Sequence, residues 1–163
     1  SASPSLSVGS TVATDLWDLA QRLYARPGVE SACLHLQEVG ADVCLLLCGA
    51  WLERHGIACT PTHVEQLQTI ARTWQETVIS PLRQLRQNWR AAAQQQVPLA
   101  ALRQRLQGLE LDAEQQLLLA LQACAQDWAE GVNGAAPAWL EALAGTTVTP
   151  DALQLLRVEA MQA

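Results

Sequence analysis

Apolar residues recur at helical spacing in the first part of the chain. Leu16, Leu19 and Leu23 fall on one helix face, and the same spacing returns between residues 29 and 39. We therefore predict helices over residues 14–25 and 29–39. Thr14 can cap the first of them, and the Arg-Pro-Gly sequence at residues 26–28 separates the two.

The segment from Ser31 to Trp51 joins two apolar stretches at a single glycine. Gly40 is suited to the left-handed conformation that ends a helix, and Asp42 stands where the N-cap of the next helix is expected. The helix predicted over residues 42–55 is apolar nearly all round as far as Trp51, which is typical of a helix buried on every side. This pattern predicts a buried helical hairpin at the centre of the fold.

Proline, glycine and capping residues divide the rest of the chain. Ser80 before Pro81 resembles a helix start, Pro98 indicates a break, and Asp112 with Gln115 resembles a capping box. Further helices are predicted at residues 60–79, 80–96, 98–109, 112–131 and 150–163, with one or two turns at 137–143. We expect a flexible lead over residues 1–13, a helical bundle over residues 14–133, and a linker with a C-terminal helix over residues 134–163 that either packs or stays mobile.

The composition agrees with an all-α fold. The chain has 163 residues, of which 50% are hydrophobic, and this length suits one domain with a sizeable core. Leu, Ala, Gln, Glu and Arg favour helices, and alternating β-branched runs are missing. We predict a single compact all-α bundle of six to eight helices with the buried hairpin at its centre.

The charge narrows the possible functions and locations. A net charge of −6 argues against a general nucleic-acid coat or a membrane-surface protein, because both need a cationic surface. The longest apolar run, residues 43–52, is far shorter than the roughly 20 residues that cross a bilayer. The five cysteines lie mostly in apolar helical sequence and suit a reduced core. We therefore expect a cytoplasmic protein without membrane contact.

One segment has the opposite charge. Residues 77–109 contain five arginines and no acid, and Arg83, Arg86 and Arg90 fall on one stripe of the helix predicted over residues 80–96. Trp89 lies beside this stripe and Trp74 one helix earlier. Guanidinium groups on one face can hold carboxylates or phosphates. The stripe is therefore a candidate site for an acidic protein partner or for a phosphate ligand. It could also be a solvated face whose arginines pair with acids on another helix.

A second candidate site lies at the mouth of the hairpin. Gln37 and Asp42 could position a ligand there, but they could equally satisfy the helix ends beside Gly40. The order Cys44, Cys48, His55, Cys59, His63 does not have the paired spacing of a zinc site. No serine-histidine-aspartate set, phosphate-binding loop or dinucleotide fingerprint is present, so we expect no metal, no cofactor and no catalytic residue.

The sequence AQRLYARPGVESACLHLQEVGADVCLLLCGAW, followed by SPLRQLR, resembles a proteobacterial family known as domain of unknown function 2390. The resemblance covers about residues 14–105. Cys44 departs from it, because a polar residue such as Asn is expected there. Membership of that family implies a small bacterial cytosolic helical protein, and it implies no particular reaction, cofactor or partner.

Three hypotheses follow. We favour a non-catalytic protein-interaction or adaptor module that docks an acidic partner through Arg83, Arg86 and Arg90 with Trp74 and Trp89. The first alternative is a module that binds phosphate, nucleotide or RNA on the same stripe. The second is an enzyme with a pocket near Gln37 and Asp42. The sequence does not decide the partner's identity or the oligomeric state.

Overall fold

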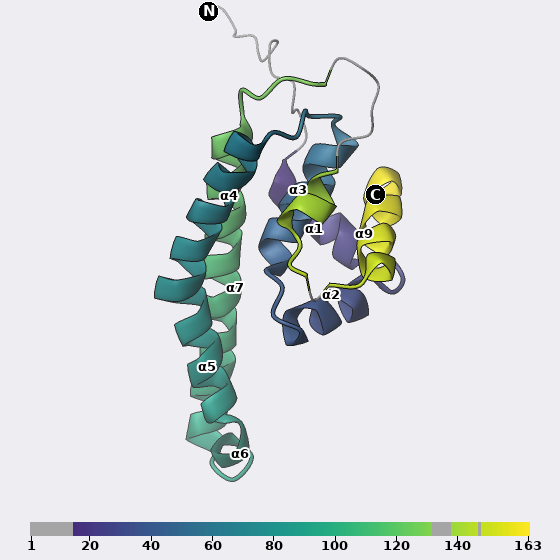
Figure 1. Ribbon diagram of the computed structural model, residues 1–163. Coiled ribbons are helices and arrows are strands. Elements are labelled where there is room, and N and C mark those ends of the chain that lie inside the picture. Colours follow the sequence, from purple (N-terminus) through teal and green to yellow (C-terminus); the bar gives the residue numbers. More distant parts are fainter. Residues whose placement is uncertain (1–14, 132–137, 147) are drawn as a thin grey trace, which may run out of the picture.

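The computed structural model describes residues 15–131, 138–146 and 148–163, which form an all-α structure. Two long antiparallel helical segments lie side by side, and the shorter helices gather against one half of this pair (Figure 1). One long segment runs through α4, η1 and α5, and the other is α7. The elements are α1 (Leu16–Tyr24), α2 (Val29–Glu38), α3 (Val43–Arg54), α4 (Pro61–Trp74), the π-helical turn η1 (Gln75–Ile79), α5 (Ser80–Asn88), α6 (Arg90–Ala93), α7 (Val97–Ala125), α8 (Trp139–Leu143) and α9 (Pro150–Gln162).

Helix α3 lies at the centre of the molecule. Every residue from position 44 to position 52 is buried, and α3 contacts α1, α2, α4, α7, α8 and α9. Gly40 has a φ of 91°, so the chain turns between α2 and α3 in a conformation that glycine adopts without strain. The side chain of Asp42 then accepts the amide of Leu45 at 3.1 Å. The all-α fold and the central buried hairpin are therefore confirmed.

The C-terminal helices pack on this centre. Gly49 of α3 lets α8 approach closely, because a Cβ at that position would lie 3.1 Å from a methyl group of Leu143. The indole nitrogen of Trp139 donates to the carbonyl of Ile57 at 2.7 Å. Helix α9 contacts α1, α2 and α3, and Arg157 on α9 pairs with Glu53 on α3 at 2.6 Å. Of the two arrangements left open for this helix, the structure has the packed one.

The helix break expected at Ser80 is absent. Ser80 has helical φ and ψ angles, and the chain runs on from α4 through η1 into α5. A proline inside a helix lacks one amide and crowds the carbonyl four residues earlier. The π turn directly before Ser80 widens the helix at this point, and burial of Ile79 holds the segment against the core. The combination accommodates Pro81 without a break.

Several other boundaries also differ from the prediction. The two helices expected at residues 98–109 and 112–131 are one helix, α7, of 29 residues. Pro98 lies in its first turn, where a missing amide costs nothing, and Asp112 is exposed on its surface. The helix predicted over residues 80–96 is instead interrupted at Trp89, between α5 and α6. Thr14 lies outside the described residues, and the side chain of Asp15 accepts the amide of Trp17 at the start of α1.

Throughout the described ranges, each helix is too short or too polar to span a membrane.

Candidate functional site

The structure brings Arg83 and Arg86 against acids of α7. Arg83 Nε lies 2.9 Å from Glu110 Oε2, and Arg86 Nε lies 2.6 Å from Glu110 Oε1. A second nitrogen of Arg83 reaches Glu114 at 3.2 Å. The side chain of Glu110 is only 7% exposed and those of the two arginines 19%. One nearly buried carboxylate therefore holds two guanidinium groups.

This network joins α5 to α7. Burial raises the pKa of Glu114, and Arg83 acts in the opposite direction. Arg103 on α7 also donates to the backbone carbonyl of Arg86 at 2.8 Å. Arg83 and Arg86 are thus paired with acids of another helix within the fold. This was one of the interpretations left open for the arginine stripe.

The remaining stripe residues lie elsewhere. Arg90 is exposed, and Trp89 is half-buried where α5 ends. Trp74 packs against the hydrophobic core, about 24 Å along the helical segment from Arg90 at 1.5 Å per residue. The five residues singled out from the sequence therefore do not form one surface.

A different surface covers the far half of the two long helical segments. We call residues 80–109 the distal arm; it comprises α5, α6 and the first part of α7 and projects beyond the other helices (Figure 1). Among the described residues, α5 and α6 contact only η1, α7 and each other. Leu106 is the only residue of the arm that is buried, whereas Leu85, Val97, Leu102 and Leu109 are 40% to 83% exposed.

The arm has a positive charge that is only partly compensated, as well as exposed leucines. It contains all five arginines of the cationic segment and no acid. Arg90 and Arg105 are exposed, and within the described part of the chain their side chains have no ion pair or hydrogen bond. The sequence indicated this charge. Because the predicted helix boundaries were wrong, it did not indicate that exposed leucines lie on the same arm.

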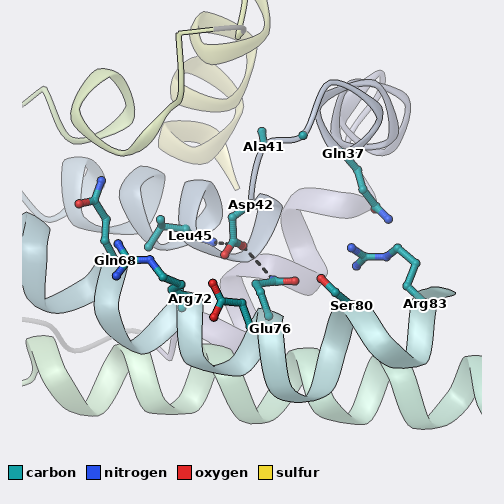
Figure 2. A pocket seen from close by; sticks show the side chains of 12 residues that line it. Gln37, Ala41, Asp42, Leu45, Gln68, Arg72, Glu76, Ser80 and Arg83 are labelled. Atoms are coloured by element: carbon teal, nitrogen blue, oxygen red, sulfur yellow. Dashed lines mark hydrogen bonds between the residues drawn. The ribbon is translucent and has the colours of Figure 1, made fainter.

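A cleft of about 510 Å³ opens between the α2–α3 turn and the α4–η1–α5 segment. Gln37 and Asp42, the polar pair singled out from the sequence, both line it. Figure 2 shows Asp42 near the middle, with Gln68 and Arg72 toward one end and Gln37 and Arg83 toward the other. A concave site therefore exists near Gln37 and Asp42, where the sequence suggested a possible pocket.

Asp42 has two structural partners in this cleft. Its Oδ1 atom accepts the Leu45 amide at 3.1 Å and the side-chain amide of Gln75 at 3.2 Å. Burial raises the pKa of Asp42, while these hydrogen bonds oppose the shift. The carboxylate therefore both caps α3 and links α3 to η1.

Sequence reasoning missed the other wall of the cleft. Gln68, Arg72, Gln75 and Glu76 line it from α4 and η1. No spacing rule pairs these positions with residues 37–42, because the contact depends on how α4 packs beside α3. The side chains of Arg72 and Glu76 are without an ion pair or hydrogen bond in the described residues, although both are charged.

The cysteines and histidines considered as ligands occupy separate packed positions. Cys44 and Cys48 are buried in α3, and burial is the main cause of the raised pKa of each thiol. The ring of His63 stacks on Trp128 with centroids 3.8 Å apart, and His55 meets Trp51 edge to face. The described residues bring together no group of three or more His, Cys, Asp or Glu side chains able to hold a metal ion.

Comparison with known protein families gave a match over most of the chain. Residues 15–121 match the model of a family described as a protein of unknown function, DUF2390. This range extends from α1 to near the end of α7, so it includes the hairpin, the cleft and the distal arm. Neither the comparison with curated proteins nor that with solved structures gave a match.

Proposed function

We propose that this chain, which belongs to the DUF2390 family of proteins of unknown function, is a non-catalytic protein-interaction module. Its distal arm docks an acidic, amphipathic helix of a partner protein. The main support is the burial pattern of the arm. Only one of its thirty residues is buried, so most of its apolar side chains are exposed to water. We also propose that the module acts in the bacterial cytoplasm, as the resemblance to this family implies.

The energetics of the arm favour a partner. Helices in proteins are stabilised mainly by packing of an apolar face. Apart from Leu106, no residue of this arm is buried. Each apolar Å² removed from water contributes about 25 cal/mol. A helix laid along the arm would cover leucines that are now in water and would so stabilise the arm itself.

The arrangement of side chains on α7 suggests what the partner looks like. Leu102, Arg105 and Leu109 are exposed and follow one another at i, i+3 and i+7, so they share one face of the helix. Two apolar anchors around a cation suit an amphipathic helix that has leucines on one side and acids beside them. Arg90, which also has no partner among the described residues, adds a second exposed guanidinium at the far end of the arm.

A quantitative pull-down from the native host tests the proposal. We expect Leu102→Gln with Leu109→Gln to reduce recovery of the partner at least tenfold, and Arg90→Gln with Arg105→Gln to do the same at low salt. Matched controls are Met161→Gln on α9, which is 61% exposed, and Arg22→Gln on α1, whose side chain is 40% exposed. Both should leave recovery unchanged.

Two results would overturn the proposal. One is equal recovery by wild type and both arm variants. The other is recovery of only this chain itself, which would identify the arm as a self-association surface. The phosphate or RNA alternative has less support, because Arg83 and Arg86 are already paired with Glu110. It predicts retention of nucleic acid that falls steeply with salt.

A further inference from the structure

We infer that the cleft between the α2–α3 turn and the α4–η1 segment binds a small zwitterion of the amino-acid class. Its ammonium group lies against Asp42 and its carboxylate against Arg72. The cleft borders the base of the distal arm, because Ser80 and Arg83 line it, but the inference does not depend on the proposed docking function.

Asp42 supplies the position for a cation. Its carboxylate is largely desolvated, yet both of the donors that contact its Oδ1 atom, the Leu45 amide and the Gln75 side chain, are neutral. A desolvated carboxylate is stabilised most by a cation in direct contact. Asp42 has no ion pair with any described residue, and the charge of Arg83 acts on it only from a distance. A primary ammonium donates up to three hydrogen bonds and is small enough to enter a cleft of this size.

Arg72 supplies the position for an anion. Two arginines line the cleft, but Arg83 is held by Glu110 and Glu114 on α7. Arg72 has no such partner among the described residues, so its guanidinium is available for a carboxylate, which it can bind through two parallel hydrogen bonds. Figure 2 shows that both residues line the cleft, Asp42 from the α2–α3 turn and Arg72 from α4.

The charges of the cleft exclude simpler ligands. A lone anion would meet the carboxylates of Asp42 and Glu76, and a lone amine would leave Arg72 unused. A volume of about 510 Å³ falls within the usual range of small-molecule sites. Gln37, Gln68 and Ser80 add neutral hydrogen-bonding groups, which favour an amino acid with a polar side chain.

Binding can be tested with defined probes and the full chain. The twenty proteinogenic amino acids are screened by thermal shift, and any hit is measured by calorimetry beside its decarboxylated amine and its N-acetyl derivative. We expect at least one polar amino acid to bind and both derivatives to bind at least tenfold more weakly. Failure of every amino acid to bind, or equal binding of the amine, would overturn the inference.

Variants then locate the site. Asp42→Asn keeps a residue that caps helices well but removes the charge, and Arg72→Gln changes an exposed side chain. Each should weaken binding of the amino acid at least tenfold without a change in helical content, while Arg22→Gln and the arm variants bind it normally. Unchanged affinity in both cleft variants would place the ligand elsewhere and so reject the inference.

Discussion

At the scale of single residues, three of the charged side chains that suggested function from the sequence have structural partners. Arg83 and Arg86 pair with Glu110, and Asp42 caps α3. The sequence was sufficient for Asp42, because a cap acts on amides two or three positions further along. It was not sufficient for Arg83, whose partner Glu110 is 27 residues away and faces it only after α5 packs on α7.

Glu110→Gln should destabilise the protein by about 2 kcal/mol. The change leaves two guanidinium groups facing a neutral amide in a poorly hydrated site, and breaking one partner of a buried pair costs about 3 to 5 kcal/mol. We expect a smaller loss because the arginine side chains remain 19% exposed. Urea unfolding measures the effect, and Asp112→Asn on the same helix, at an exposed position, is the control. Equal stability of the two variants would contradict the paired network.

Stability should fall at alkaline pH because of buried thiols. Burial raises the pKa of Cys33 to about 11 from its ordinary value of 9.0. Between these two pH values the unfolded chain loses the thiol proton while the folded chain keeps it, so the free energy of unfolding decreases as pH rises. The limiting slope for one group is about 1.4 kcal/mol per pH unit.

The Cys33 contribution can be isolated by comparing urea midpoints at pH 8.5 and pH 10.5. Cys33→Ala should lose less stability across this interval than wild type does, although it is less stable at the lower pH. Cys124→Ala, at a half-buried position, should change the slope less. An identical slope in wild type and Cys33→Ala would show that this thiol does not contribute.

At the scale of elements, the capping and helix-breaking residues in the sequence predicted where most helices lie. They did not predict the ends of the long helical segments. The Ser-Pro sequence at residue 80 and the Asp112–Gln115 pattern both resemble helix starts, yet each lies within a continuous helical segment. Side chains buried on one face of α7, from Leu106 through Glu110 and Ala113 to Leu117, keep the backbone helical across the Asp112–Gln115 pattern. Packing of a whole face outweighs a capping preference of about 1 kcal/mol.

Gly108→Ala is a direct test of the continuous α7. A Cβ at this position meets nothing within 4 Å, and alanine is favoured over glycine in a helix interior by about 1 kcal/mol. We therefore expect a higher melting temperature. If α7 were broken near this residue, as the sequence suggested, the substitution would be neutral or destabilising.

At the scale of the whole molecule, the C-terminal segment completes the core. Leu156 of α9 is fully buried, and Arg54 of α3 donates to the carbonyl of Ala160 at 2.7 Å. The family match ends at residue 121, so α8 and α9 lie beyond it although they cover α3. The tertiary structure therefore adds a layer that neither the hairpin pattern nor the family match indicated.

Leu156→Ala should lower the free energy of unfolding by about 2 to 5 kcal/mol, the usual cost of a cavity in a packed core. Val158→Ala on the same helix, at a position 40% exposed, should cost much less. Urea unfolding followed by circular dichroism distinguishes the two. A negligible effect at Leu156 would mean that α9 is not packed in solution.

The sequence by itself determined the all-α class, the central hairpin and the Asp42 cap of α3, because these depend on helical periodicity and on contacts between residues a few positions apart. Only the tertiary structure decided that Arg83 is neutralised, that Arg72 faces the same cleft as Asp42, and that leucines remain exposed along the distal arm. Those features depend on the packing of helices distant in sequence. A side chain's burial and its partners follow from that packing, and so does its availability for function.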